Sequence, residues 1–194
     1  MDTSTRENNE SSRSKSHKLL MDSIYVAMFA AVIAVCSQIQ LPLGPVPFTL
    51  QTLGVFTAAG MLGTKRGVLS TLIYILIGAV GIPVFAGFSG GLGCITGPTG
   101  GYIIGFLLTA LAVGLMTKLA GRKVWSLVVG MVAGLVLCYA FGTAWFIFVN
   151  GQNGTAMDLA TALGYCVIPF LIPDAAKIAV AVILVNRLDK IVKL

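Results

Sequence analysis

Long apolar runs, separated by short polar or glycine-rich breaks, dominate this chain. A membrane-spanning helix needs about 20 mostly apolar residues. Several of the runs are shorter than that, yet their number and order predict six transmembrane helices. The predicted segments are residues 24–39, 48–62, 68–80, 102–116 and 124–149, with a sixth that ends near residue 188. We therefore expect an all-α membrane protein.

The first 21 residues stand apart from this pattern. They are polar, mixed in charge and rich in Ser and Asn, which is the composition of a disordered segment. They are also too long and too polar for the start of a signal peptide, so the first apolar segment is expected to be retained. The prediction is a disordered cytoplasmic tail over residues 1–21 and a single six-helix transmembrane domain over residues 22–194.

The composition agrees with a membrane protein. Hydrophobic residues make up 57% of the 194 residues and charged residues 10%, whereas a soluble domain carries about 25% charged residues. The net charge of +6 could indicate nucleic-acid binding, but the basic residues fall in alternate connections. They include Arg13, Lys15 and Lys18 in the tail, Lys65 and Arg66 after the second segment, Lys118, Arg122 and Lys123 after the fourth, and Arg187, Lys190 and Lys193 at the C-terminus.

This alternation of basic and uncharged connections is what the positive-inside rule predicts for six helices with both termini in the cytoplasm. Adding or removing one helix would break it. The excess positive charge then faces the cytoplasmic leaflet of the lipid bilayer. We therefore expect a multi-pass protein of the cell membrane with no nucleic-acid partner.

The connector between the third and fourth segments, residues 81–101, contains eight glycines and no charge. Non-helical backbone at membrane depth occurs only where it is buried in protein or lines a cavity. In the predicted topology this connector opens on the outer side of the membrane. It is either an ordinary turn-rich loop or a lid over a ligand.

An acidic and a basic residue, Asp174 and Lys177, lie three positions apart at the head of the sixth segment, just after Pro173. This spacing places both on one helix face, and an ionisable group within the membrane costs at least ~2.5 kcal/mol. Lys177 precedes Arg187 by ten residues, or about 15 Å of helix in a core about 30 Å thick, so the pair lies in the outer half. The pair is either structural or a ligand clamp. Its position beside the connector favours the clamp.

The sequence argues against an enzyme. Residues 87–91 fit the G-x-S-x-G pattern around Ser89, but a serine nucleophile needs a base, and the single histidine is His17 in the polar tail. Ser89 with Lys177 is the one remaining catalytic interpretation. Residues 97–101 lack the Gly-Lys-Ser/Thr of a phosphate-binding loop, and the four cysteines lack metal-ligand spacing. No catalytic residue, metal or cofactor is predicted, and uphill transport would need a partner or an ion gradient.

Small residues four positions apart recur in the apolar segments, where they allow helices to approach closely in lipid. The pairs are Ala27/Ala31 and Ala30/Ala34 in the first segment, Gly101/Gly105 in the fourth and Gly130/Gly134 in the fifth. The alanines either pack within the bundle or dock another membrane subunit.

Three ordered stretches resemble one known family. They are Pro47-Phe-Thr-Leu-Gln-Thr-Leu-Gly54, Gly97-Pro-Thr-Gly-Gly-Tyr102 and Pro173-Asp174-x-x-Lys177. They resemble the BioY family, the biotin-binding S components of energy-coupling factor (ECF) transporters, and the likeness extends over roughly residues 24–188. It implies six helices, no catalysis, a ligand site near the outer face, and partners comprising a membrane T subunit and two ATPase subunits. It also implies that Ala27, Ala30, Ala31 and Ala34 dock the T subunit.

The chemistry of these residues suits biotin, whose ureido ring presents two N–H donors and a carbonyl. Asp174 accepts hydrogen bonds, whereas Lys177 donates to a carbonyl or carboxylate. We expect Ser89, Gly90, Gly91 and Tyr102 to line the connector side, with Thr49 and Gln51 contributing from the second segment. The expected function is high-affinity biotin capture at the outer face and ATP-driven import as the substrate-specific subunit. The alternatives are a stand-alone secondary transporter, an S component for another small vitamin, and a membrane enzyme.

Overall fold

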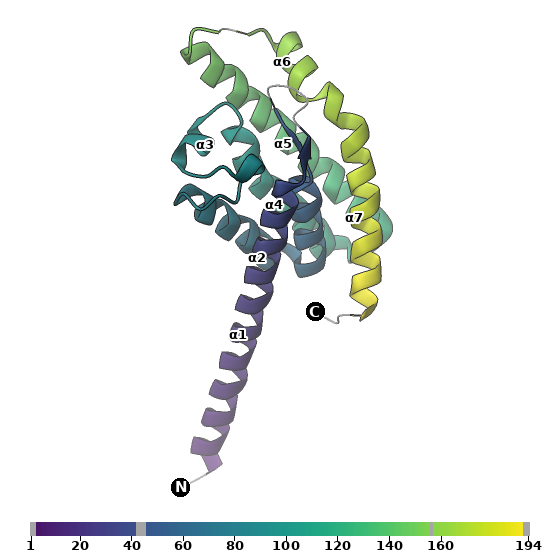
Figure 1. Ribbon diagram of the computed structural model, residues 1–194. Helices are drawn as coiled ribbons and strands as arrows, with labels where there is room; N and C mark the ends of the chain where they lie inside the picture. Colours follow the sequence, from purple (N-terminus) through teal and green to yellow (C-terminus); the bar gives the residue numbers. More distant parts are fainter. Residues whose placement is uncertain (1–2, 42–45, 156, 192–194) are drawn as a thin grey trace.

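The computed structural model describes residues 3–41, 46–155 and 157–191, and these form a helical bundle with short connecting elements (Figure 1). The elements in chain order are α1 (Thr3–Gln38), β1 (Gln40–Leu41), β2 (Phe48–Thr49), α2 (Gln51–Ala79), η1 (Ala86–Phe88), α3 (Leu92–Thr96), α4 (Gly100–Ala120), α5 (Val124–Gln152), α6 (Leu159–Cys166), η2 (Ile168–Phe170) and α7 (Leu171–Ile191).

Within the described residues, five helical stretches are long and apolar enough to cross a membrane. They lie at Lys15–Gln38, Gln51–Ala79, Gly100–Ala120, Val124–Gln152 and Leu159–Ile191. The second of them, α2, is broken at Gly63, whose φ of 73° and ψ of −169° are not helical. The break divides α2 into two arms that match the predicted segments 48–62 and 68–80. The six-helix membrane fold is thus confirmed, and most of its helices are longer than the apolar runs indicated.

Helix α1 departs from the prediction at its N-terminal end. It begins at Thr3 and continues without a break to Gln38, so helix replaces the predicted disorder over residues 3–21. The stretch contains neither Gly nor Pro, the two residues that most strongly interrupt helices, and its polar residues therefore extend the apolar helix that follows. This part of α1 projects beyond the other helices (Figure 1).

Glycines allow α4 and α5 to pack closely at the centre of the bundle. A Cβ at Gly105 of α4 would lie 2.9 Å from the Cys138 sulfur, and one at Gly134 of α5 would lie 2.9 Å from the Thr109 Cα. Both distances are too short for any side chain larger than hydrogen. Because dispersion between packed surfaces drives helix association in lipid, this close approach is a main source of bundle stability.

The proline-containing stretch after α1 forms a small hairpin that the sequence did not predict. Strand β1 pairs antiparallel with β2, with Gln40 opposite Thr49 and Leu41 opposite Phe48. Figure 1 shows the hairpin at the end of the bundle away from both chain termini. The hairpin brings Thr49 and the start of α2 to the site described below.

The glycine-rich connector, residues 81–101, is folded back onto the bundle and contains η1 and α3. The end of α1 holds it in place: the Gln38 amide donates to the Phe85 carbonyl at 3.2 Å and accepts from the Phe88 N–H at 3.0 Å. Gly87 and Gly91 have positive φ values of 69° and 95°, so glycine is needed at these turns.

Helix α7 (Leu171–Ile191) starts two residues before Pro173. Pro173 lies in the first turn, where its missing N–H costs little. Asp174 also lies in that turn, where the helix dipole favours an anion. The short elements α6 and η2 lead into it and direct Phe170 inward, where the side chain is buried.

Candidate functional site

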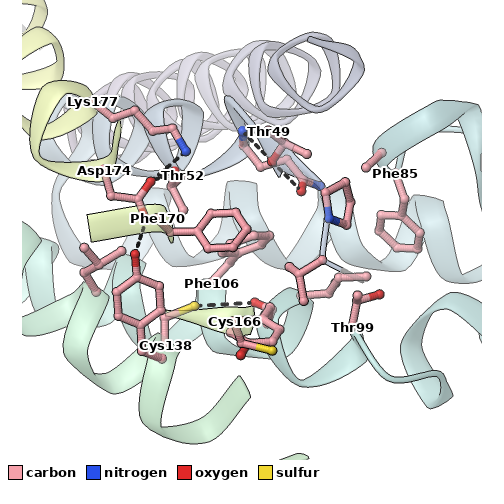
Figure 2. Close-up of a pocket in the computed structure, with 18 of the residues that line it drawn as sticks. Thr49, Thr52, Phe85, Thr99, Phe106, Cys138, Cys166, Phe170, Asp174 and Lys177 are labelled. Carbon is pink, nitrogen blue, oxygen red and sulfur yellow. Dashed lines mark hydrogen bonds and ion pairs between the residues drawn. The ribbon is translucent and has the colours of Figure 1, made fainter. Parts of the chain in front are cut away.

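A cavity of about 170 Å³ lies between β2, the connector, the N-terminal ends of α2, α4 and α7, and the middle of α5. Its wall is mostly apolar, with a few polar side chains that converge on it. Figure 2 shows Asp174 and Lys177 at one end of the cavity and Phe85 and Thr99 toward the other. A mostly apolar enclosure with few polar groups is the usual form of a small-molecule site.

The predicted ion pair lies in this wall. The Lys177 Nζ is 2.6 Å from the Asp174 Oδ1, and the two residues are 5% and 2% exposed. Asp174 also accepts a hydrogen bond from the Tyr139 hydroxyl on α5 and a long one, at 3.5 Å, from the Thr52 hydroxyl on α2. The carboxylate is therefore fixed by three helices, as a buried charge must be if its desolvation is to be offset.

Aromatic rings enclose the cationic partner. The Lys177 ammonium lies 4.1 Å from the centre of the Phe48 ring, a cation–π distance. Phe48 in turn stacks against Phe170, with the ring centres 6.4 Å apart. The hairpin and η2 thus form an apolar cover over the charged end of the cavity.

A second polar group lies at the start of α2. The Thr49 hydroxyl donates to the Gln51 Oε1 at 3.0 Å, and the Gln51 amide nitrogen donates to the Tyr74 hydroxyl. An amide side chain offers two donors and two acceptor positions, so Gln51 is held firmly and still has one of each to offer. Both predicted contributors, Thr49 and Gln51, line the cavity.

On the connector side, Ser89 and Tyr102 line the cavity as predicted. The Tyr102 hydroxyl lies 2.9 Å from the Thr143 hydroxyl. Its ring packs on Gly142, where a Cβ would lie 2.3 Å from the ring. The Ser89 hydroxyl donates to the Ala86 carbonyl at 2.8 Å. Tyr102 is therefore rigidly placed by α5, and Ser89 is tied into the connector itself.

Gly90 and Gly91 are not among the residues that line the cavity. A Cβ at Gly90 would lie 2.5 Å from the Ile82 carbonyl oxygen. The Gly91 N–H donates to the Gly78 carbonyl at 2.7 Å. Both glycines thus pack closely against the chain at the end of α2, and their contact with a ligand stays a prediction.

Several residues in and around the wall were not predicted from the sequence. Tyr139 and Thr52 contact Asp174. Phe48 packs on the Lys177 ammonium and stacks against Phe170, which lines the cavity. A signal for Tyr139 was present, because a tyrosine hydroxyl within an apolar helix needs a hydrogen-bond partner. Phe48 lies in the first of the three family-like stretches, but that resemblance did not indicate its contact with Lys177.

The geometry gives no support to the catalytic interpretation. The Ser89 hydroxyl is engaged by the Ala86 carbonyl, and the Lys177 ammonium is engaged by Asp174. Three thiols, those of Cys94, Cys138 and Cys166, line the cavity, but the described residues contain no group of His, Cys, Asp or Glu that could hold a metal ion. The arrangement can bind a small polar molecule and contains no activated nucleophile.

The alanines of α1 divide between two faces. Ala27 and Ala31 are exposed, beside the exposed Met28. Ala30 is 4% exposed and lies in the core, and Ala34 packs against the core. A docking role is therefore compatible with Ala27 and Ala31, whereas Ala30 faces away from any partner.

Comparison with known proteins agrees with these features. A sequence model of the BioY family matches residues 7–194. The biotin transporter BioY of Thermotoga maritima is 43% identical over 168 residues, which cover 87% of this chain and 95% of that protein. The probable biotin transporter BioY of Pyrococcus horikoshii is 45% identical over 164 residues, covering 84% and 93%.

A solved structure supports the same assignment. The crystal structure of the S-component for biotin from an ECF-type ABC transporter matches with a TM-score of 0.79 and 27% identity. The match covers 90% of this chain and 93% of that chain. From the sequence match and the shared fold together, this chain belongs to the BioY family.

Proposed function

We propose that this chain is the biotin-binding S component of an ECF-type transporter and that biotin binds in the cavity at the head of α7. The observation that carries the proposal is the buried Asp174–Lys177 pair, which faces a mostly apolar enclosure. Because the chain belongs to the BioY family, whose relatives include a biotin transporter, we take biotin as the ligand.

The wall chemistry matches the parts of biotin. The ureido N–H groups would donate to Asp174, and Lys177 would donate to the ureido carbonyl or to the carboxylate. Ile103, Phe106 and Leu135 would contact the apolar ring and tail. The hydroxyls of Tyr102 and Ser89 and the amide of Gln51 remain as further polar contacts.

The ion pair also lowers the cost of binding. Its charges are already desolvated and fixed by Tyr139, Thr52 and Phe48 before the ligand arrives. A preorganised site loses little side-chain entropy when it binds its ligand. This supports tight capture of a scarce vitamin by a small cavity.

Import requires energy from a partner. The chain has no phosphate-binding loop, so we assign ATP hydrolysis to two ATPase subunits joined through a membrane T subunit. The distribution of basic residues supports cytoplasmic termini, with the cavity toward the outer face. The exposed face of α1 at Ala27 and Ala31 would dock the T subunit by close helix approach.

Ligand identity is tested by equilibrium dialysis of the purified chain with labelled biotin, in competition with thiamine and riboflavin. We expect one saturable biotin site per chain that neither competitor displaces. Displacement by another vitamin at similar concentration would instead indicate an S component for that vitamin.

Energy coupling is tested in liposomes that contain either the chain alone or the chain with T and ATPase subunits and internal ATP. We expect biotin accumulation only in the complete assembly. Accumulation by the chain alone would favour a secondary transporter with the ion pair as a relay.

A further inference from the structure

A second hollow, of about 440 Å³, lies at the other end of the first arm of α2. It is formed where α2 breaks at Gly63, beside the last turns of α4 and the loop to α5. Gly63 follows Gln51 of the biotin cavity by twelve residues, about 18 Å of helix. The two sites share no residue.

Three cations line this hollow: Lys65, Lys118 and Arg122. Arg122 pairs with Asp189 and donates to the Met61 carbonyl at 2.6 Å. It still has unused N–H donors, since a guanidinium carries five. Within the described part of the chain, neither Lys65 nor Lys118 has a carboxylate at ion-pair distance. Cations gathered in one hollow repel one another unless an anion lies between them.

The donors of this hollow suit an anion. The ammonium groups of Lys65 and Lys118 and the guanidinium of Arg122 match the oxygens of a phosphate group.

We propose that this hollow is an anion site that binds a phosphate group through Lys65, Lys118 and Arg122. A phosphate can be carried by an anionic phospholipid of the adjacent leaflet or by a soluble ion. Leu115 in the wall is partly exposed, and Leu119 nearby is 77% exposed. An acyl chain could follow these leucines, as at basic pockets between membrane helices.

The competing explanation is that these basic residues only orient the chain in the membrane. In that case any cytoplasmic lysine would be equivalent. Matched variants separate the two explanations.

The experiment measures the thermal unfolding midpoint of the full chain in neutral detergent, titrated with phosphatidylglycerol, with phosphatidylcholine of the same acyl chains, or with inorganic phosphate at constant ionic strength. The test variant is Lys65→Gln with Lys118→Gln. The control is Lys123→Gln with Lys190→Gln, which removes equal charge from positions outside the hollow. Biotin binding verifies that each variant is folded.

We expect phosphatidylglycerol to raise the midpoint of the wild type and the control, and phosphatidylcholine to leave it unchanged. The phosphatidylglycerol concentration giving half the effect should rise about fivefold for each pocket lysine removed. Protection by inorganic phosphate as well would identify the phosphate group itself as the ligand, whereas protection by lipid alone would assign the site to phospholipid.

The proposal is overturned if the two lipids act alike or if the two double variants respond equally. If neither phosphatidylglycerol nor inorganic phosphate shifts the unfolding midpoint of the wild type, the hollow is not an anion site.

Discussion

At the residue scale, Asp174 is held by more side-chain contacts than the other polar groups of the cavity at the head of α7. It is bound by Lys177 on its own helix and by Tyr139 and Thr52 on two others. The sequence identified the charged pair because two ionisable residues in an apolar helix are unusual. It did not identify the two hydroxyls, because their role depends on where α2 and α5 pass α7 in the folded bundle.

The Tyr139 hydroxyl can be removed with little change in shape. In Tyr139→Phe the buried carboxylate loses a charge-assisted hydrogen bond, so the free energy of unfolding should fall by about 1.5–3 kcal/mol. Tyr165→Phe is the control, because Tyr165 is exposed on α6. Chemical denaturation in mild detergent measures both, and an equal effect in the two variants would contradict the role given to Tyr139.

The Tyr102 ring packs directly against Gly142, in the space that a side chain there would occupy. In Gly142→Ala the new methyl would overlap the tyrosine ring, and overpacking of this kind costs about 1–3 kcal/mol. Gly151→Ala, on the same helix with open space around it, should instead be neutral or stabilising by up to about 1 kcal/mol. Unfolding midpoints that fall in both variants, or in neither, would refute this account of the packing.

At the element scale, the hydropathy pattern predicted the helices because each one must satisfy its own backbone hydrogen bonds in lipid. The hairpin, η1 and α3 were not predicted, since they are short and are held by tertiary contacts such as those of Gln38 with residues 85 and 88. For the same reason the sequence did not reveal that Gly90 and Gly91 pack against residues 78–82. The polar start of α1 was predicted to be disordered because composition alone does not reveal that it continues an apolar helix.

Helix α1 also offers a test of partner docking. Ala31→Phe places a bulky ring on its exposed face, which should reduce co-purification of the T subunit at least about tenfold, because small residues are needed for close approach. Biotin affinity should stay within about twofold of the wild type, since Ala31 does not line the cavity. Val180→Phe, at an exposed position on α7, is the control. If the Ala31→Phe variant co-purifies with the T subunit as well as the wild type does, the exposed face of α1 is not the docking surface.

At the scale of the whole molecule, the two ends of the bundle carry different kinds of residues. One end holds a mostly apolar cavity with a fixed ion pair, and the other carries the clustered lysines and arginines around Gly63 and the C-terminal end of α7. The charge pattern of the loops was sufficient to predict this polarity, because basic residues are retained on the cytoplasmic side. The charge pattern did not identify the partner subunits. The lack of a phosphate-binding loop in the sequence indicates only that the energy for import comes from another source.

The central claim is that Asp174 and Lys177 anchor biotin, and calorimetric titration of the purified chain tests it most directly. Asp174→Asn and Lys177→Gln should each weaken binding at least about 30-fold, because each leaves a buried charge without its partner. The double variant should lose little more than either single one, since the two residues act as a unit. Asp189→Asn, which removes a paired carboxylate far from the cavity, should bind biotin like the wild type. Wild-type affinity in both single variants would contradict the claim.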